Sequence, residues 1–120
     1  MPDAPFEQKA NALSNRGWVC FVAGRIKEAI ADSRQAVTLD PKNVNALGNL
    51  AISLLVDHQT NDSLAVYDAA IEFADTEGFA DLEKDLREAI AKHGELPGVE
   101  EVRARIKLRT GSLQATTATE

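Results

Sequence analysis

Small and apolar side chains recur every three or four residues along most of the chain, with polar side chains between them. This spacing places them on one face of an α-helix, because neighbouring turns bring residues i, i+3 and i+4 together. Turn-forming residues interrupt the pattern, as in the GELPG segment at 94–98. The pattern therefore predicts an all-α chain, with helices at 6–23, 26–39, 43–57, 61–75, 78–92 and 99–109.

The apolar pattern occurs twice, at 10–43 and again at 44–77. Superposing the first copy on the second aligns Leu13 with Leu47 and Ala36 with Ala70, and small or apolar residues coincide at the other matched positions. Each copy consists of a helix, a turn and a helix. One such pair cannot bury its apolar face alone, so we expect consecutive pairs to stack on one another.

The copies at 10–43 and 44–77 resemble the tetratricopeptide repeat, a helix-turn-helix unit of about 34 residues. The matching residues are Leu13, Gly17, Cys20, Ala29, Ala36 and Pro41 in the first copy, and Leu47, Leu50, Ala51, Leu54, Tyr67 and Ala70 in the second. The resemblance implies a right-handed α-α superhelix, which is a solenoid of antiparallel helix pairs. The segments 78–92 and 99–109 would be its C-terminal capping helices.

Several residues depart from the family pattern. They are Arg16, Ser33, His58, Ser63 and Asp75. Arg16 stands where the pattern has Leu, and His58 replaces the glycine of the turn. An all-helical hairpin array with the same period is therefore the structural alternative. In both cases we expect one domain at 1–109 and a disordered tail at 110–120, which is small and polar.

The composition limits the class of protein. Hydrophobic residues make up 44% of the 120 residues but aromatic residues only 5%, so Ala and Leu fill most of the core. A net charge of −6 disfavours a nucleic-acid surface, because phosphate binding needs clustered Lys and Arg. The sequence has no apolar run long enough for a membrane span, and the single Cys20 cannot form an internal disulfide. These features predict a cytoplasmic protein without membrane contact.

Charge is unevenly distributed. The second copy, 44–77, holds six acidic residues and no Lys or Arg, whereas 99–109 holds four basic residues against two Glu. The acidic residues either form a solvated surface or bind a basic partner. The sixth helix of this chain is one candidate for that partner. We expect the sixth helix to pack on the repeats and to cover the surface around Trp18 and Phe21.

Catalytic chemistry has few candidates in this sequence. Cys20 is expected in the core, His58 in a turn and His93 at the end of the fifth helix, so no nucleophile is paired with a base. The sequence contains no phosphate-binding glycine loop and no metal-ligand spacing. We therefore expect a protein that is not an enzyme and that uses no cofactor or metal.

The family resemblance assigns the first helix of each repeat to a concave surface. The residues expected to line this groove are Asn11, Ser14, Trp18, Phe21, Asn45, Asn49, Ile52 and Leu55. An apolar groove edged by amides suits a short helix or an extended peptide of another protein, with Trp18 as the anchor. Trp18 is alternatively buried by the fifth or sixth helix. The same groove is alternatively a contact between copies of the chain, which gives a homo-oligomer.

One mechanism known in this family does not fit. Family members that bind the C-terminal carboxylate of heat-shock chaperones use a clamp of Lys, Asn and Arg. The equivalent positions here are Ser14, Trp18, Asn49, Phe79 and Glu83, of which only Asn49 matches. A carboxylate needs cationic donors, and Glu83 would repel it. The chaperone-adaptor function is therefore excluded.

Overall fold

The computed structural model describes residues 4–118, with side chains for 5–111, and this part of the chain contains six helices and no strand. The helices are α1 (Ala4–Val22), α2 (Ile26–Leu39), α3 (Val44–Val56), α4 (Thr60–Phe73), α5 (Thr76–His93) and α6 (Val99–Ala118). The prediction of an all-α chain is confirmed. None of the helices in the described range is long and apolar enough to cross a membrane.

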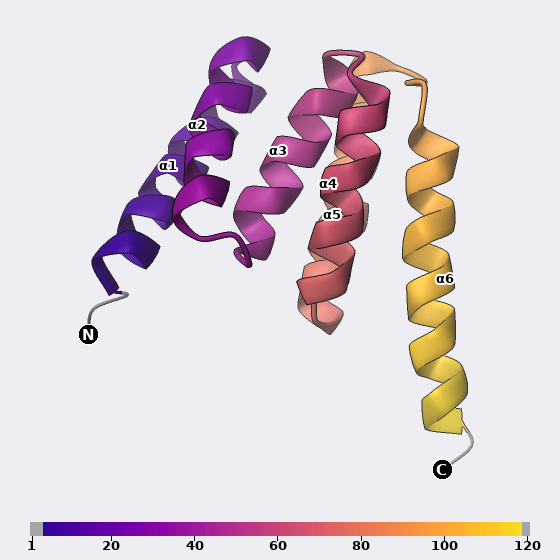
Figure 1. The fold of residues 1–120 in the computed structure, drawn as a ribbon. Helices are drawn as coiled ribbons and strands as arrows, with labels where there is room; N and C mark the ends of the chain where they lie inside the picture. The colour runs from indigo at the N-terminus through magenta and orange to yellow at the C-terminus, as the bar shows by residue number, and fades with distance from the viewer. Residues whose placement is uncertain (1–3, 119–120) are drawn as a thin grey trace.

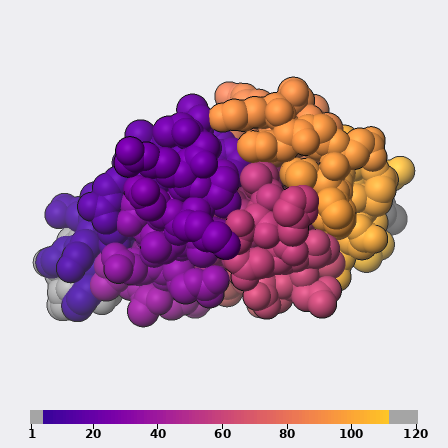
Figure 2. Space-filling model, turned by 90° about the horizontal axis from the view of Figure 1, so that it is seen from above, coloured from indigo at the N-terminus to yellow at the C-terminus, as the bar shows by residue number. Residues whose placement is uncertain are grey.

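The six helices run alternately up and down, so that successive helices are antiparallel (Figure 1). The most extensive contacts join α1 to α2, α3 to α4, and α2 to α3. The fifth helix packs on α3, and α6 packs on α4 and α5. The molecule measures 42 by 42 by 20 Å, and Figure 2 shows α1 and α2 at one end of the row and α6 at the other.

The core is centred on α3, which is contacted by α1, α2, α4 and α5. Its residues Ala51, Ile52, Leu54 and Leu55 are 0% exposed. A helix that is covered on several sides must be apolar around most of its circumference. This explains why the sequence of α3, VNALGNLAISLLV, contains no charged residue.

The turns α1–α2 and α3–α4 have the same geometry and occupy equivalent positions in the two copies. Gly24 (φ 83°) and His58 (φ 64°) both adopt the left-handed conformation. In each turn two amide N–H groups donate to carbonyl oxygens three and five residues earlier, the pattern of a Schellman helix end. The bonds run from Gly24 to Phe21, Arg25 to Cys20, His58 to Leu55 and Gln59 to Leu54, at 2.8–3.1 Å. The match between the two copies in the sequence therefore extends to the backbone conformation of their turns.

Two departures from the family pattern lie at the contact between α1 and α2: Arg16 forms an ion pair across it, and the buried Ser33 hydroxyl has no hydrogen-bond partner among the described residues. Arg16 donates from Nε and an Nη to the two Asp32 carboxylate oxygens at 2.8 Å, and this hydrogen bonding lowers the pKa of Asp32. Ser33 lies against Gly17, where an added Cβ would be 2.7 Å from the Ser33 hydroxyl oxygen. Gly17 and Ser33 are both small, and this allows α1 and α2 to approach closely.

The sixth helix differs from its prediction in two ways. It runs to Ala118 instead of ending at Arg109, so the disordered tail expected at 110–120 is corrected for residues 110–118, and 119–120 lie outside the described residues. Glycine weakens a helix without forbidding it, and the Thr110 hydroxyl donates to the Ile106 carbonyl oxygen at 3.0 Å. The helix continues through Gly111.

The position of α6 also corrects an expectation. It packs on α4 and α5, away from Trp18 and Phe21. Gly98 (φ 95°) sets its direction, because an added Cβ there would lie 2.7 Å from Thr60 Cγ2 in α4. Arg105 then donates from Nε to Asp68 of α4 at 2.8 Å, so one basic residue of the sixth helix does pair with the acidic second copy.

Candidate functional site

The structure does not assemble the eight expected groove residues into an open groove. Ile52 and Leu55 belong to the core, and Phe21 and Ser14 are buried as well. The cause is α5, which lies on α3 where Gly48 leaves room for Leu82, with a Gly48 Cβ position only 3.0 Å from Leu82 Cδ2. The apolar floor of the expected groove is therefore occupied by a helix of the same chain.

The amides of the expected groove mainly connect helices within the chain. Asn49 Nδ2 donates to the backbone carbonyl and the hydroxyl of Ser14, at 3.0 and 2.9 Å. Asn43 Nδ2 donates to Asn11 Oδ1 at 2.8 Å. These bonds join α1 to the start and middle of α3. Of the four asparagines and serines expected at the groove, only Asn11 and Asn45 are exposed.

Trp18 is half-buried at the junction of α1 with the end of α5. Its ring stacks on Phe21 with 5.2 Å between centroids, and Phe21 meets the edge of the His93 ring at 6.2 Å. Lys92 Nζ donates to the Val22 carbonyl oxygen at 2.7 Å. The fifth and the sixth helix were both expected as possible covers for Trp18, and α5 is the one that lies beside it.

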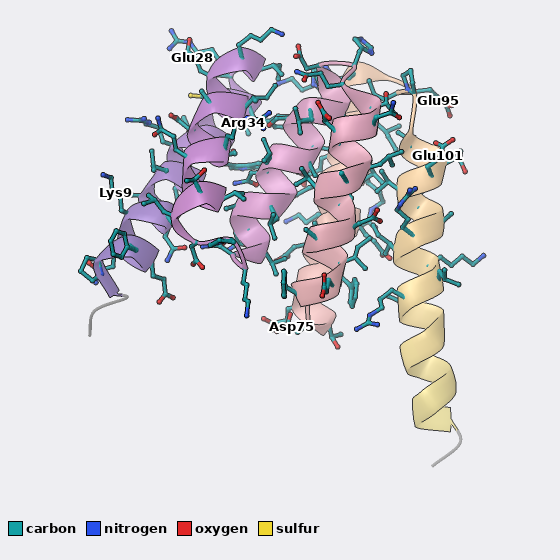
Figure 3. All side chains as sticks on the ribbon, in the orientation of Figure 1. Lys9, Glu28, Arg34, Asp75, Glu95 and Glu101 are labelled. Carbon is teal, nitrogen blue, oxygen red and sulfur yellow. The ribbon has the colours of Figure 1, made fainter. Side chains whose placement is uncertain are left out.

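An open cleft lies on the first helix pair instead. It is built by α1 and α2 alone, and its volume is about 630 Å³. The lining residues are Lys9, Leu13, Ala31, Arg34, Gln35, Thr38 and Leu39. Lys9 and Arg34, both labelled in Figure 3, are the only charged residues among those that line it, so the cleft is mostly apolar with two basic side chains.

A second groove lies at the other end of the row, between α5 and α6. Its volume is about 310 Å³, and its lining residues are Glu83, Leu86, Arg87, Arg103, Ile106, Lys107 and Thr110. Leu86 and Ile106 are buried and form the apolar floor. Three cations and one carboxylate surround this floor.

The residues considered for catalysis lie on different elements. Cys20 is on α1, His58 is in the α3–α4 turn and His93 ends α5, and none of the hydrogen bonds in the described range joins Cys20 to either histidine. Cys20 packs against the core, as expected, but is half-buried instead of buried. Within residues 4–118, His, Cys, Asp and Glu form no group of three or more that could hold a metal ion.

Neither cleft was predicted from the sequence, because the repeat pattern indicates which face each helix pair presents but not which side of the first pair lacks a covering helix. The signal was available in the match between the two copies. Leu47 is buried by the preceding pair, whereas its counterpart Leu13 is only half-buried and lines the α1/α2 cleft. For the α5/α6 groove, the spacing of Arg103 and Lys107 already placed both on one face of a helix.

The chain matches no protein-family model and no curated protein. The surfaces and the chemistry of this chain are therefore the basis for assigning a function.

Proposed function

We propose that this protein is a non-catalytic protein-protein interaction module that binds an amphipathic helix of another protein in the α1/α2 cleft. One observation carries the proposal: a cleft of about 630 Å³ built by one helix pair, with Leu13, Ala31 and Leu39 inside it. A partner helix with an apolar ridge fits such a surface.

The internal packing provides a precedent for this binding. Within the chain, α3 packs on both α1 and α2, and buries Leu47 and Leu50 against them. A partner helix in the cleft would contact the same two helices as α3 does. Helix packing of this kind is driven by apolar area, so binding should depend only weakly on salt.

We also propose that the helices form a right-handed superhelical stack of the tetratricopeptide type. The alternating helix directions and the two identical turns at equivalent positions of the copies support it. The Gly17 contact supports it too, since a Cβ there would lie 3.3 Å from the Ala29 carbonyl oxygen. A cytoplasmic location belongs to the same proposal, because the lone Cys20 has no partner for a disulfide.

The experiment for the cleft uses two matched variants. Ala31→Arg places a bulky cation in the cleft, and Ala65→Arg places the same side chain on an exposed position of α4. Wild-type protein selects binders from a library of amphipathic helical peptides, and calorimetry measures their affinity for each variant. We expect Ala31→Arg to weaken binding by about tenfold or more, and Ala65→Arg to leave it unchanged. Equal binding to all three proteins would reject the cleft.

Self-assembly through the ends of the row is the alternative function, and charge opposes it. The α1/α2 cleft carries Lys9 and Arg34, while the α5/α6 groove carries Arg87, Arg103 and Lys107. Head-to-tail contact would bring like charges together. Sedimentation over a range of concentrations decides the matter, since an interaction module stays monomeric and an assembling protein does not.

A further inference from the structure

The α5/α6 groove concentrates positive charge on an acidic protein. The whole chain has a net charge of −6, but the groove has three cations, Arg87, Arg103 and Lys107, against Glu83 alone. The cations come from two helices and surround one opening. Arg103 also pairs with Glu100 at 3.1 Å, an exposed pair one turn away on α6 that contributes little and can exchange for another carboxylate.

An apolar strip of α6 adjoins this groove. Ala104, Lys107, Leu108 and Gly111 line a shallow hollow of about 490 Å³, and Lys107 lines the hollow and the groove together. Leu108 is 77% exposed, the highest value among the exposed large hydrophobic residues. The surface therefore combines a basic rim, a buried apolar floor and an exposed leucine.

The geometry points to a docking surface for an acidic amphipathic helix of a partner protein across the α5/α6 groove and the Leu108 strip. Apolar residues of the partner helix cover Leu108 and Ala104, and its carboxylates face Lys107, Arg103 and Arg87. Arginine binds carboxylates through two parallel hydrogen bonds, which gives this contact directional selectivity.

The apolar component favours a protein helix over a nucleic acid. Proteins that bind single-stranded nucleic acids use aromatic side chains on which bases stack, and the residues that line the groove and the hollow include Leu, Ile and Ala but no aromatic residue. A chain of net charge −6 also repels an extended polyanion at long range, whereas a short acidic helix meets chiefly the local cations.

This surface is separate from the α1/α2 cleft and does not depend on it. The two lie at opposite ends of the helix row (Figures 1 and 2). If both are occupied, the protein connects two partners, one held mainly by apolar contact and the other mainly by charge. Salt distinguishes the two contacts, because added salt weakens exposed charge pairs much more than apolar contacts.

The test uses a synthetic amphipathic helix with leucines on one face and glutamates on both sides, and a matched peptide in which each glutamate is lysine. Fluorescence anisotropy measures binding to the full chain. We expect the acidic peptide to bind, the basic peptide not to bind, and affinity for the acidic peptide to fall as salt rises.

Three charge reversals locate the binding. Lys107→Glu should weaken it by about tenfold or more, whereas Lys84→Glu, on an exposed part of α5 outside the groove, should leave it unchanged. Arg34→Glu in the α1/α2 cleft should also have no effect. Leu108→Ala should weaken binding without changing the melting temperature, since Leu108 is exposed.

Three results would overturn the inference. The first is equal affinity of the acidic peptide for wild type and Lys107→Glu. The second is loss of binding in Arg34→Glu instead, which would assign the peptide to the α1/α2 cleft. The third is tighter binding of a single-stranded oligonucleotide than of the acidic peptide, lost in Lys107→Glu, which would make the groove a nucleic-acid surface.

Discussion

Asn49 of α3 donates from Nδ2 to two oxygens of Ser14 in α1, the carbonyl at 3.0 Å and the hydroxyl at 2.9 Å. Both residues were expected to face a partner protein. They instead link the first helix pair to the central helix, in a part-buried place where water replaces lost hydrogen bonds poorly. The polar residues next to the core thus stabilise the arrangement of helices.

Replacing Asn49 by Ala should lower the free energy of unfolding by about 1–2 kcal/mol, because both hydrogen bonds are lost and the Ser14 hydroxyl is left unpaired. Urea denaturation measures the change. Asn45→Ala is the matched control, since Asn45 lies on the same helix but is exposed. An equal loss of stability in both variants would show that the hydrogen bonds to Ser14 do not account for the effect of Asn49→Ala.

Two glycine-to-alanine substitutions should have opposite effects. Gly17→Ala brings a methyl group within 2.7 Å of the Ser33 hydroxyl oxygen and 3.3 Å of the Ala29 carbonyl oxygen. We expect it to lower stability by about 1–3 kcal/mol through overpacking. Gly111→Ala meets no atom within 4 Å in the described residues, and should stabilise α6 by about 1 kcal/mol. Thermal melting followed by circular dichroism compares them, and a stabilising Gly17→Ala would contradict the close approach.

His58→Gly should raise the free energy of unfolding by about 1 kcal/mol, because a residue with a Cβ is strained in the left-handed conformation that His58 adopts. The reciprocal change, Gly24→Ala, should lower it by a similar amount at the equivalent turn. Both values come from urea denaturation. If neither variant changes stability, the left-handed backbone of the two turns is not maintained in solution.

Asp85→Asn should stabilise the protein at neutral pH. Burial raises the pKa of Asp85 to about 6, with Glu88 and Asp81 adding repulsion. Because the folded-state value exceeds the unfolded value, the protonated form favours folding, and this contribution is lost as the pH rises through about 6. After discounting for partial exposure, we expect a gain of about 1 kcal/mol at pH 7.5.

The pH dependence identifies the source of that gain. The advantage of Asp85→Asn should shrink as the pH falls below 6 and disappear near pH 4, where the aspartate is protonated in the folded state. Glu72→Gln, which removes an exposed carboxylate of α4, is the control for the loss of one negative charge. A gain that is the same at pH 4 and pH 7.5 would exclude titration of Asp85 as the cause.

The helices and the positions of the two equivalent turns could be predicted from the sequence because both depend on local spacing. Gly24 and His58 mark equivalent turns, and the match between the two copies identified them before their backbone angles were known. The end of α6 could not be predicted in this way. Gly111 and the serine and threonines after it are poor helix formers, and local propensity is a weak guide when a helix is already established before them.

The candidate site was less predictable because it depends on contacts between distant segments. The stripe of Phe79, Leu82 and Leu86 showed that α5 has an apolar face, but any exposed apolar surface of the repeats could have received it. Gly48 determines where α5 packs, because the missing side chain lets Leu82 contact α3. A single sequence does not show that Gly48 and Leu82 are neighbours. Once α5 is placed there, the apolar floor of the expected groove is covered.

The lack of charge on α3 has a consequence for solubility. Nine of its 13 residues are buried by the neighbouring helices, and α5 covers one side of α3. A chain that loses α5, by proteolysis or by truncation before Thr76, would expose a continuous apolar helix to other copies. Such a fragment would aggregate even if its four remaining helices still formed, so α5 keeps the folded protein dispersed as well as stable.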